Sequence, residues 1–316
     1  WVKQRYDLIV TKEVINFVPG IVPGIGMAMN CFTQKGDKVM IQPPVYHPFA
    51  WVTTRNERTL VTNPLKWENG MYRMDLDTFR EQIKGCKLFI LCNPHNPGGV
   101  VWTEAELRAI ADICYDEKVL VFSDEIHADL TLPPHTHRPF ATVSEKARMN
   151  SVTFMSPSKA FNMPGLSASH ALIFNEDLRK RFRIYMDAGE LDMGHVFAFL
   201  SVEAAYSHGT EWLDQCLAYI QGNIDFVDEF LKKHAPKIKA IRPEASYLVW
   251  LDCRELKLSQ KDLNEFFVDK AHLALNDGEM FGKEGIGFMR LNVASPRCII
   301  EKAMKQLADA YQLYIK

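Results

Sequence analysis

The stretch VTFMSPSKAFNMPGLSAS, residues 152–169, decides how this chain is interpreted. Its apolar start predicts a buried strand, which ends in two serines, a lysine and a Pro-Gly pair. Most lysines are solvated, so a loop lysine at the surface is the ordinary interpretation of Lys159. A lysine at the end of a buried strand, between small hydroxyl side chains, is the alternative: a candidate nucleophile beside a phosphate site.

Apolar runs of the same kind recur along the first two thirds of the chain. They cover residues 39–41, 88–92, 119–122, 152–155 and 171–174. Such runs are typical of strands buried on both faces. Helical patterns separate them, and the clearest, at residues 102–118, opens with a capping box of Thr103 and Glu106. The alternation predicts an α/β fold with a mostly parallel sheet.

The last third of the chain has a different pattern. Residues 194–235 form a long helical pattern in which Gly209 and Gly222 are the expected interruptions. After Pro236 come a strand, a helix, a second strand and a terminal helix that starts at Pro296. We therefore expect a large domain over residues 1–213 and a smaller α+β domain over residues 214–316.

Composition narrows the function classes. The 316 residues are 47% hydrophobic and 24% charged, which is ordinary for a globular protein. The formal net charge is −2, so no overall field attracts nucleic acid or an anionic membrane, and no apolar run has the length of a bilayer span. The seven cysteines are scattered without a C-x-x-C pair, which indicates a reducing compartment such as the cytoplasm rather than a disulfide framework.

Three other predicted strand ends carry residues suited to ligand binding. Residues 17–30 contain two Pro-Gly pairs before a helix expected from Ile25, whose free N–H groups could hold a phosphate. Residues 88–99 end in two Asn-Pro pairs, which most often build turns. Asp124 directly follows an apolar strand, where a carboxylate needs a charged or strongly hydrogen-bonding partner unless it caps the next segment, and His127 lies three residues on.

Together these features resemble the fold-type-I enzymes that use pyridoxal 5′-phosphate (PLP), the aminotransferase class I/II superfamily. The nearest resemblance is to the cystathionine β-lyase-like branch of cysteine C–S lyases. The stretches that carry it are PGIVPGI, PPVYHPF, NPHNPGGVVWT, SDEIHADL, SPSKAFNMPGL, PEASYLVWLD and GFMRLNVASPR. The resemblance implies a seven-stranded, mostly parallel sheet in a three-layer large domain, a small C-terminal α+β domain, and PLP as the cofactor.

The resemblance also implies roles for the residues that match. Lys159 would bind PLP covalently and, with Tyr46, act as a catalytic residue. Asp124 would pair with the pyridine nitrogen. Asn96 and His127 would contact the 3′-oxygen of the cofactor, and Tyr46 would stack on its ring.

The remaining roles concern the phosphate and the substrate. The backbone of Ile21 and Val22, with the hydroxyls of Ser156 and Ser158, would hold the phosphate. Arg290, aided by Asn96, would bind the α-carboxylate of an amino-acid substrate, a bidentate contact to which arginine is well suited. On its own Arg290 would be interpreted as a surface arginine.

The family includes lyases and aminotransferases, and fold cannot separate them. His127, and Ser167 in place of a phosphate-binding arginine, favour a β-lyase that releases pyruvate, ammonia and a thiol such as homocysteine. An aminotransferase is the alternative, and a non-enzymatic regulatory module is disfavoured by the near-neutral charge.

Two features depart from the family pattern. Val100 stands where an arginine is expected after the NPGG turn. The family also has several dozen residues ahead of the segment WVKQRYDLIV, including a tyrosine that reaches the cofactor phosphate of a neighbouring subunit. We therefore expect a longer natural chain and a homodimer with shared active sites.

Overall fold

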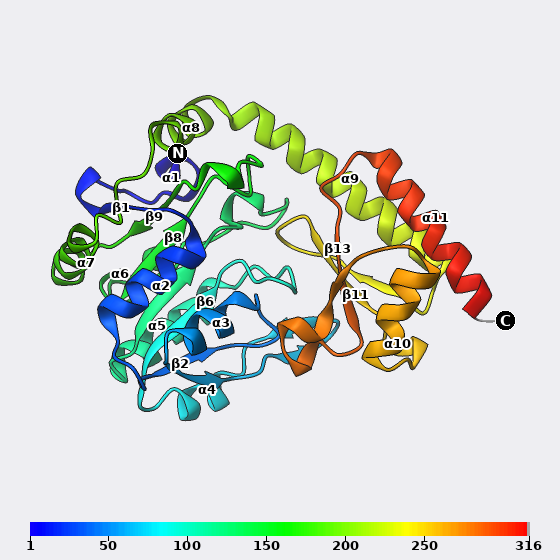
Figure 1. Ribbon diagram of the computed structural model, residues 1–316, viewed down its shortest axis with the longest axis horizontal. Coiled ribbons are helices and arrows are strands. Elements are labelled where there is room, and N and C mark those ends of the chain that lie inside the picture. Colours follow the sequence, from blue (N-terminus) through cyan, green and yellow to red (C-terminus); the bar gives the residue numbers. More distant parts are fainter. Residues whose placement is uncertain (315–316) are drawn as a thin grey trace.

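The computed structural model describes residues 1–314, and its largest element is a seven-stranded sheet of order β1-β9-β8-β7-β6-β2-β3 (Figure 1). Strands β8, β7, β6, β2 and β3 pair in parallel, whereas β9 is antiparallel to both of its neighbours. The strands are β1 Ile15–Val18, β2 Lys38–Ile41, β3 Thr59–Thr62, β6 Cys86–Cys92, β7 Leu120–Asp124, β8 Ser151–Met155 and β9 Ser169–Leu172. Each of the five predicted runs overlaps one of these strands, although β9 begins and ends two residues earlier than predicted.

Helices cover both faces of this sheet, which gives the three layers expected. Along β6, Leu88 and Ile90 pack into the cluster under α2, whereas Phe89 and Leu91 pack into the cluster under α5. This alternation follows from the two-residue period of a strand. The helices of the large domain are α1 Val2–Tyr6, α2 Ile21–Phe32, α3 Pro48–Arg55, α4 Leu76–Gln82, α5 Glu104–Asp116, α6 Glu145–Met149, α7 Glu176–Ala188 and α8 Val196–His208.

The starts of two helices, α5 and α2, were predicted from the sequence. The capping box is confirmed: the Thr103 hydroxyl accepts from the Glu106 amide, and the Glu106 carboxylate accepts from the Thr103 amide. The start of α2 was predicted at Ile25 but lies at Ile21. Pro23 fits inside the first turn because the first four N–H groups of a helix have no intrahelical partner.

The C-terminal part of the chain forms a four-stranded antiparallel sheet of order β10-β11-β13-β12. Its strands are β10 Lys239–Ile241, β11 Leu248–Asp252, β12 Asn276–Asp277 and β13 Phe288–Asn292. Helices α9 Thr210–His234, α10 Gln260–Glu265 and α11 Arg297–Tyr314 accompany this sheet, and a π-helical turn, Phe266–Lys270, continues α10. A separate hairpin is made by β4 Lys66–Glu68 and β5 Met71–Arg73.

Helix α9 connects the two sheets as one long rod (Figure 1). The predicted interruption at Gly209 is confirmed, because α8 ends at His208 and α9 begins at Thr210. The predicted interruption at Gly222 is wrong. A glycine costs a helix about 1 kcal/mol, and the burial of neighbours such as Ile220 and Ile224 outweighs that cost. The division at residues 213/214, which falls in the first turn of α9, stays a proposal.

The topology brings functional segments together at one edge of the large sheet. The carboxyl ends of β6, β7 and β8 lie at this edge because the three strands are parallel, and the amino end of the antiparallel β9 joins them. Ligands of open α/β sheets bind at such an edge. None of the helices within residues 1–314 combines the length and the apolar composition that a membrane crossing requires.

Candidate active site

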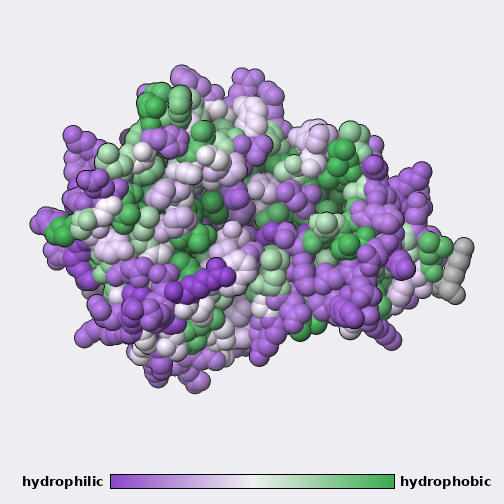
Figure 2. Space-filling model, in the orientation of Figure 1, coloured by the Kyte–Doolittle hydropathy of each residue, from purple (hydrophilic) through white to green (hydrophobic). Residues whose placement is uncertain are grey.

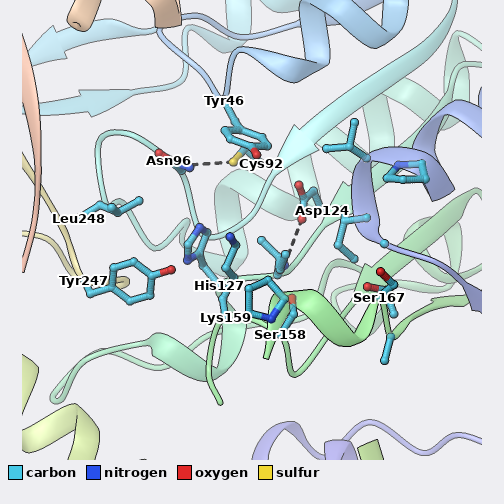
Figure 3. A pocket seen from close by; sticks show the side chains of 18 of the residues that line it. Tyr46, Cys92, Asn96, Asp124, His127, Ser158, Lys159, Ser167, Tyr247 and Leu248 are labelled. Carbon is cyan, nitrogen blue, oxygen red and sulfur yellow. Dashed lines mark hydrogen bonds between the residues drawn. The ribbon is translucent and has the colours of Figure 1, made fainter. Parts of the chain in front are cut away.

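A cavity of about 370 Å³ lies at this edge of the large sheet, and β11 and β13 of the small sheet contribute to its wall (Figure 3). All the predicted site residues except Ser156 line it. They are Ile21, Val22, Tyr46, Asn96, Asp124, His127, Ser158, Lys159 and Arg290. Residues that are far apart in the sequence therefore meet in one place, as the resemblance implied.

Asp124 is the last residue of β7 and is almost fully buried. Its Oδ1 accepts a hydrogen bond of 3.1 Å from the amide of Ile126, the one hydrogen bond found for this carboxylate within residues 1–314. Burial raises the pKa of Asp124 to about 7, and the Glu125 carboxylate acts in the same direction. The capping contact to Ile126 accounts for one oxygen. The positive charge of Lys159 acts to lower the pKa of Asp124, but no ion pair to this carboxylate is found within residues 1–314. The site therefore favours a positively charged group beside Asp124.

His127 lies in the same wall and is buried, and its Nδ1 has no hydrogen-bond partner among the described residues 1–314. Burial lowers the pKa of His127 to about 3, helped by the positive charges of Lys159 and Arg290. The imidazole is therefore neutral near pH 7. A neutral imidazole offers one N–H donor and one acceptor, which suits contact with a ligand oxygen.

Asn96 is held by two contacts that leave its side-chain amide available. Its Oδ1 accepts a 2.9 Å hydrogen bond from Nη1 of Arg290, and its backbone amide lies 3.3 Å from Sγ of Cys92. Because the carbonyl oxygen is engaged, the N–H groups of the side chain are the donors left for a ligand.

Arg290 extends from β13 of the small sheet, and the two domains meet at its guanidinium. Besides Asn96, it donates from Nη2 to Oδ1 of Asn276 at 2.7 Å, and it lies over the ring of Phe281 at 4.7 Å. The Nε of Arg290 is buried without a partner in the part of the chain that the structure describes, and burial lowers the pKa of the guanidinium. The planar group is thus oriented on two sides, with donor capacity left for a carboxylate.

The predicted phosphate ligands do not all line the cavity. Ile21 and Val22 open the twelve-residue helix α2, where backbone N–H groups are free for an anion. Ser158 lines the cavity, but Ser156 does not. Ser156 instead makes contacts within its own loop region: its Oγ donates to the carbonyl oxygen of Ala168 at 2.8 Å and accepts from the Ser158 amide at 3.1 Å. Ser156 therefore fixes the loop rather than facing a ligand.

Other lining residues were not predicted from the sequence. They are Cys92, Ser169, Tyr247 and Asn292, together with apolar residues of the same loops; Ser167, noted above in place of a phosphate-binding arginine, lines the cavity as well. Tyr247 could have been found, since it stands just before an apolar strand in the quoted motif PEASYLVWLD, and its ring lies edge-on to His127 at 6.1 Å. Ser169 carried no signal, because it reaches the cavity only through the antiparallel entry of β9.

Val100, which departs from the family pattern, has a structural explanation. Its side chain is fully buried in the core cluster that contains Trp102 and Phe89. An unpaired arginine in these surroundings would be costly, so an apolar residue suits this position.

Comparison with known proteins identifies the family of this chain. The family model for aminotransferase class I and II matches residues 1–307. The cystathionine β-lyase PatB of Bacillus subtilis is 38% identical over 98% of this chain and 81% of its own length.

Two solved structures are also similar. Cystalysin from Treponema denticola, which contains PLP, superimposes with a TM-score of 0.97 at 34% identity, over 100% of this chain and 80% of its own. The PLP-bound C–S lyase from Staphylococcus hominis gives a TM-score of 0.90 at 33% identity, over 98% of this chain and 80% of its own. The chain thus spans about four fifths of these relatives, and by family match, identity and fold it belongs to aminotransferase class I and II.

Proposed function

We propose that this protein is a PLP-dependent carbon–sulfur β-lyase that acts on S-substituted cysteines, cystathionine among them. The reaction consumes water and yields pyruvate, ammonia and a thiol. The observation that carries the proposal is the meeting of Lys159, Asp124 and Arg290 in one cavity. The names of the relatives, a cystathionine β-lyase and C–S lyases, support the reaction type and give the aminotransferase alternative less support.

The residues of the cavity fit PLP. The Asp124 carboxylate, buried with one hydrogen bond, suits the protonated nitrogen of a pyridine ring. Lys159 would form the covalent link, Asn96 and His127 would contact the 3′-oxygen, and the Tyr46 ring would cover the cofactor ring. The start of α2 and Ser158 would receive the phosphate. Bound PLP supplies the sink for the electron pair left when the Cα–H bond breaks.

The side chains then divide the reaction between them. Arg290 holds the substrate carboxylate, Asp124 keeps the proton on the ring nitrogen, and the freed Lys159 amine accepts the Cα proton. The electrons of the Cα–H bond form a Cα–Cβ double bond as the Cβ–S bond breaks. Lys159 returns a proton to the departing sulfur, and hydrolysis of the released aminoacrylate gives pyruvate and ammonia.

The test is product formation in the absence of any keto-acid acceptor. The holoenzyme is incubated with an S-alkyl-L-cysteine or with cystathionine, and thiol and pyruvate are measured together. We expect equal amounts of both. Amino-group transfer that requires an added keto acid, without thiol release, would show an aminotransferase instead.

We expect Arg290→Lys to raise the KM for the amino-acid substrate at least about tenfold, with a smaller change in kcat. Lysine keeps the charge but loses the two-pronged contact and the hydrogen bonds to Asn96 and Asn276. Steady-state kinetics on one substrate measures both constants. The matched control is Arg254→Lys, because Arg254 pairs with Asp252 at the surface of the same sheet. An unchanged KM in the Arg290 variant would contradict the assignment.

We expect the stabilisation of the protein by PLP to grow between about pH 5 and pH 8. In the cofactor-free protein Asp124 has a pKa raised to about 7, so its contribution to folding is most favourable at low pH and declines as the pH rises through about 7. A cationic ring nitrogen offsets that loss. The shift in Tm on adding PLP, measured across this range, should therefore be larger at high pH.

The control for this pH dependence is Asp124→Asn, which has no charge to bury. Its PLP-induced shift in Tm should vary less with pH than that of the wild-type protein. The same pH dependence in both proteins would mean that Asp124 does not face the ring nitrogen.

We also propose a homodimer with shared active sites. Helix α8 presents large apolar side chains to solvent, and hydrophobic surface gathers over this end of the molecule (Figure 2). The exposed apolar side chains of α8 are Val196, Phe197, Phe199 and Leu200. Contiguous exposed apolar surface of this kind supports an interface. Sedimentation velocity of the holoenzyme should give twice the mass of one chain, and a monomer at micromolar concentration would contradict the proposal.

We further propose that the partners are small amino-acid substrates rather than nucleic acid or membrane, and that the location is cytoplasmic. The net charge of −2 and seven free cysteines, four of them buried thiols, support this. Turnover of cystathionine would release homocysteine and place the enzyme in methionine biosynthesis. Cell fractionation with an antibody tests the location, and recovery in a secreted fraction would contradict it.

A further inference from the structure

A second cavity, of about 320 Å³, adjoins the first beyond Lys159. The two cavities have five residues in common: Ser158, Lys159, Pro164, Tyr247 and Asn292. Tyr46 and Asp124 line only the first cavity. In Figure 3, Tyr46 lies on one side of the first cavity and Ser158 and Lys159 lie on the other. The second cavity therefore opens from the lysine side of the site.

The outer wall of the second cavity comes mainly from α9. Trp212, Cys216, Tyr219 and Ile220 lie along this helix and face the cavity. The Trp212 ring stacks on Phe161, with 5.7 Å between ring centroids and 26° between planes.

Tyr219, the second aromatic residue of this wall, is also held in position. The Tyr219 hydroxyl accepts a 2.6 Å hydrogen bond from the amide of Arg297. Both rings are nevertheless about half exposed, Trp212 at 50% and Tyr219 at 51%. They offer a fixed apolar surface that a ligand can cover.

The lining of this cavity carries very little charge. Lys159 is the one charged side chain among its lining residues, all of which lie within the described part of the chain. Arg297, which follows the lining residue Pro296, donates from Nε to Oδ1 of Asn223 at 2.8 Å and lies over the ring of Phe226 at 4.8 Å. A ligand group in this cavity thus meets aromatic and aliphatic side chains and a few uncharged polar ones (Ser158, Asn162, Asn292 and Ser295), without a lining acid or arginine to pair with.

We propose that the second cavity is the subsite for the S-substituent of the leaving thiol, and that it selects neutral alkyl and aryl groups. The proposal rests on the β-lyase function proposed above. Lys159 borders both cavities, so an amine that accepts the Cα proton in the first can protonate a sulfur at the mouth of the second. The Cβ–S bond breaks, its electron pair stays on sulfur, and the neutral thiol RSH remains against Trp212 and Tyr219.

This subsite disfavours a zwitterionic substituent. The distal half of cystathionine carries an ammonium and a carboxylate, and removing them from water without counter-charges is unfavourable. S-butyl-L-cysteine has a substituent of similar length without these charges, so the two substrates form a matched pair. We therefore expect this chain to prefer neutral substituents over cystathionine, the substrate in the name of its relative PatB.

The size of the S-substituent should set the value of kcat/KM. Each methylene that leaves water contributes about threefold to fourfold in affinity. Because the walls are half exposed, we expect kcat/KM for S-butyl-L-cysteine to exceed that for S-methyl-L-cysteine by about tenfold, and that for cystathionine by at least as much. Thiol and pyruvate release by the holoenzyme measures all three values.

Variants of Trp212 test whether this cavity is the cause. Trp212→Ala should lower kcat/KM about tenfold for S-benzyl-L-cysteine and S-butyl-L-cysteine but leave S-methyl-L-cysteine nearly unchanged. Trp212→Arg can keep a stacked contact with Phe161 and adds a cation, so it should raise the ratio of cystathionine to S-butyl-L-cysteine. Tyr115→Ala, which removes a half-exposed aromatic residue from α5, is the control and should leave every ratio as it is.

The outcomes separate the two proposals. If no S-substituted cysteine yields thiol, the β-lyase function is wrong. If S-methyl-L-cysteine is a substrate but kcat/KM does not rise with the size of the substituent, or the Trp212 variants slow all substrates equally, the subsite is wrong while the lyase stands. A loss of folding in the alanine variant is detected by its Tm, and Trp212→Arg then decides alone.

Discussion

Replacing Lys159 by alanine is expected to abolish covalent cofactor binding and to lower β-elimination by at least about a thousandfold. This residue would serve both as the attachment point of PLP and as the group that moves the Cα proton, and a positioned acid–base group alone contributes about 10²–10⁴ in rate. The variant should lose PLP on dialysis, whereas the wild-type protein stays yellow. Absorbance after dialysis and thiol release with an S-alkyl-L-cysteine measure the two effects.

The control is Lys146→Ala, which removes a surface lysine that pairs with Asp112 and Asp116. It should keep both colour and activity. Added small primary amines should restore part of the proton transfer in the Lys159 variant but have no effect on the control. A Lys159→Ala protein that retains its colour after dialysis and turns over substrate near the normal rate would refute the assignment.

The second large effect is expected at Asp124. Asp124→Ala should abolish elimination, and Asp124→Glu should retain some, because only a carboxylate keeps the proton on the cofactor ring and thus maintains the electron sink. The geometry supports this expectation, because Asp124 is buried with a single amide hydrogen bond and no ion pair within residues 1–314.

The alternative for Asp124 is a purely structural cap of the loop that follows β7. A cap is a local backbone contact, here to the Ile126 amide, and its loss would lower the Tm without selectively removing kcat. Measuring kcat, PLP content and Tm on the same preparations separates the two roles. Near-normal turnover in Asp124→Ala would show that the carboxylate only caps the loop.

Much of the site was predictable because its residues follow buried strands. In a parallel sheet the carboxyl ends of the strands meet at one edge, so Asp124 after β7 and Lys159 after β8 were expected at the same edge once both runs were identified as strands. The structure adds that β7 and β8 are adjacent. The capping box of Thr103 and Glu106 was predictable for a different reason, since it depends only on residues three apart.

Other parts of the site depend on contacts that no local pattern contains. Arg290 and Asn96 are 194 residues apart and meet only when the small sheet packs against the large one. Ser156 and Ser158 are equivalent in the sequence, yet the path of the loop turns only Ser158 to the cavity. The helical pattern around Gly222 was misjudged because propensity is a weak local effect and the burial of α9 decided the outcome.

The second cavity could not be predicted from the sequence either. Its apolar wall is one side of a helix that also packs into a core, so the periodicity of α9 alone indicates burial and not a binding surface. The position of Lys159 beside that wall is what supports a role for the wall in binding the leaving thiol.

The most direct test of the account is to reduce the holoenzyme with borohydride and map the labelled peptide by mass spectrometry. Reduction fixes the cofactor to the lysine that holds it, before any substitution disturbs the protein. We predict a single pyridoxyl group within the peptide that contains SPSKAFN, on Lys159. A pyridoxyl group on any other lysine, or a protein that takes up no label after incubation with PLP, would contradict the claim that these strand ends form a PLP site.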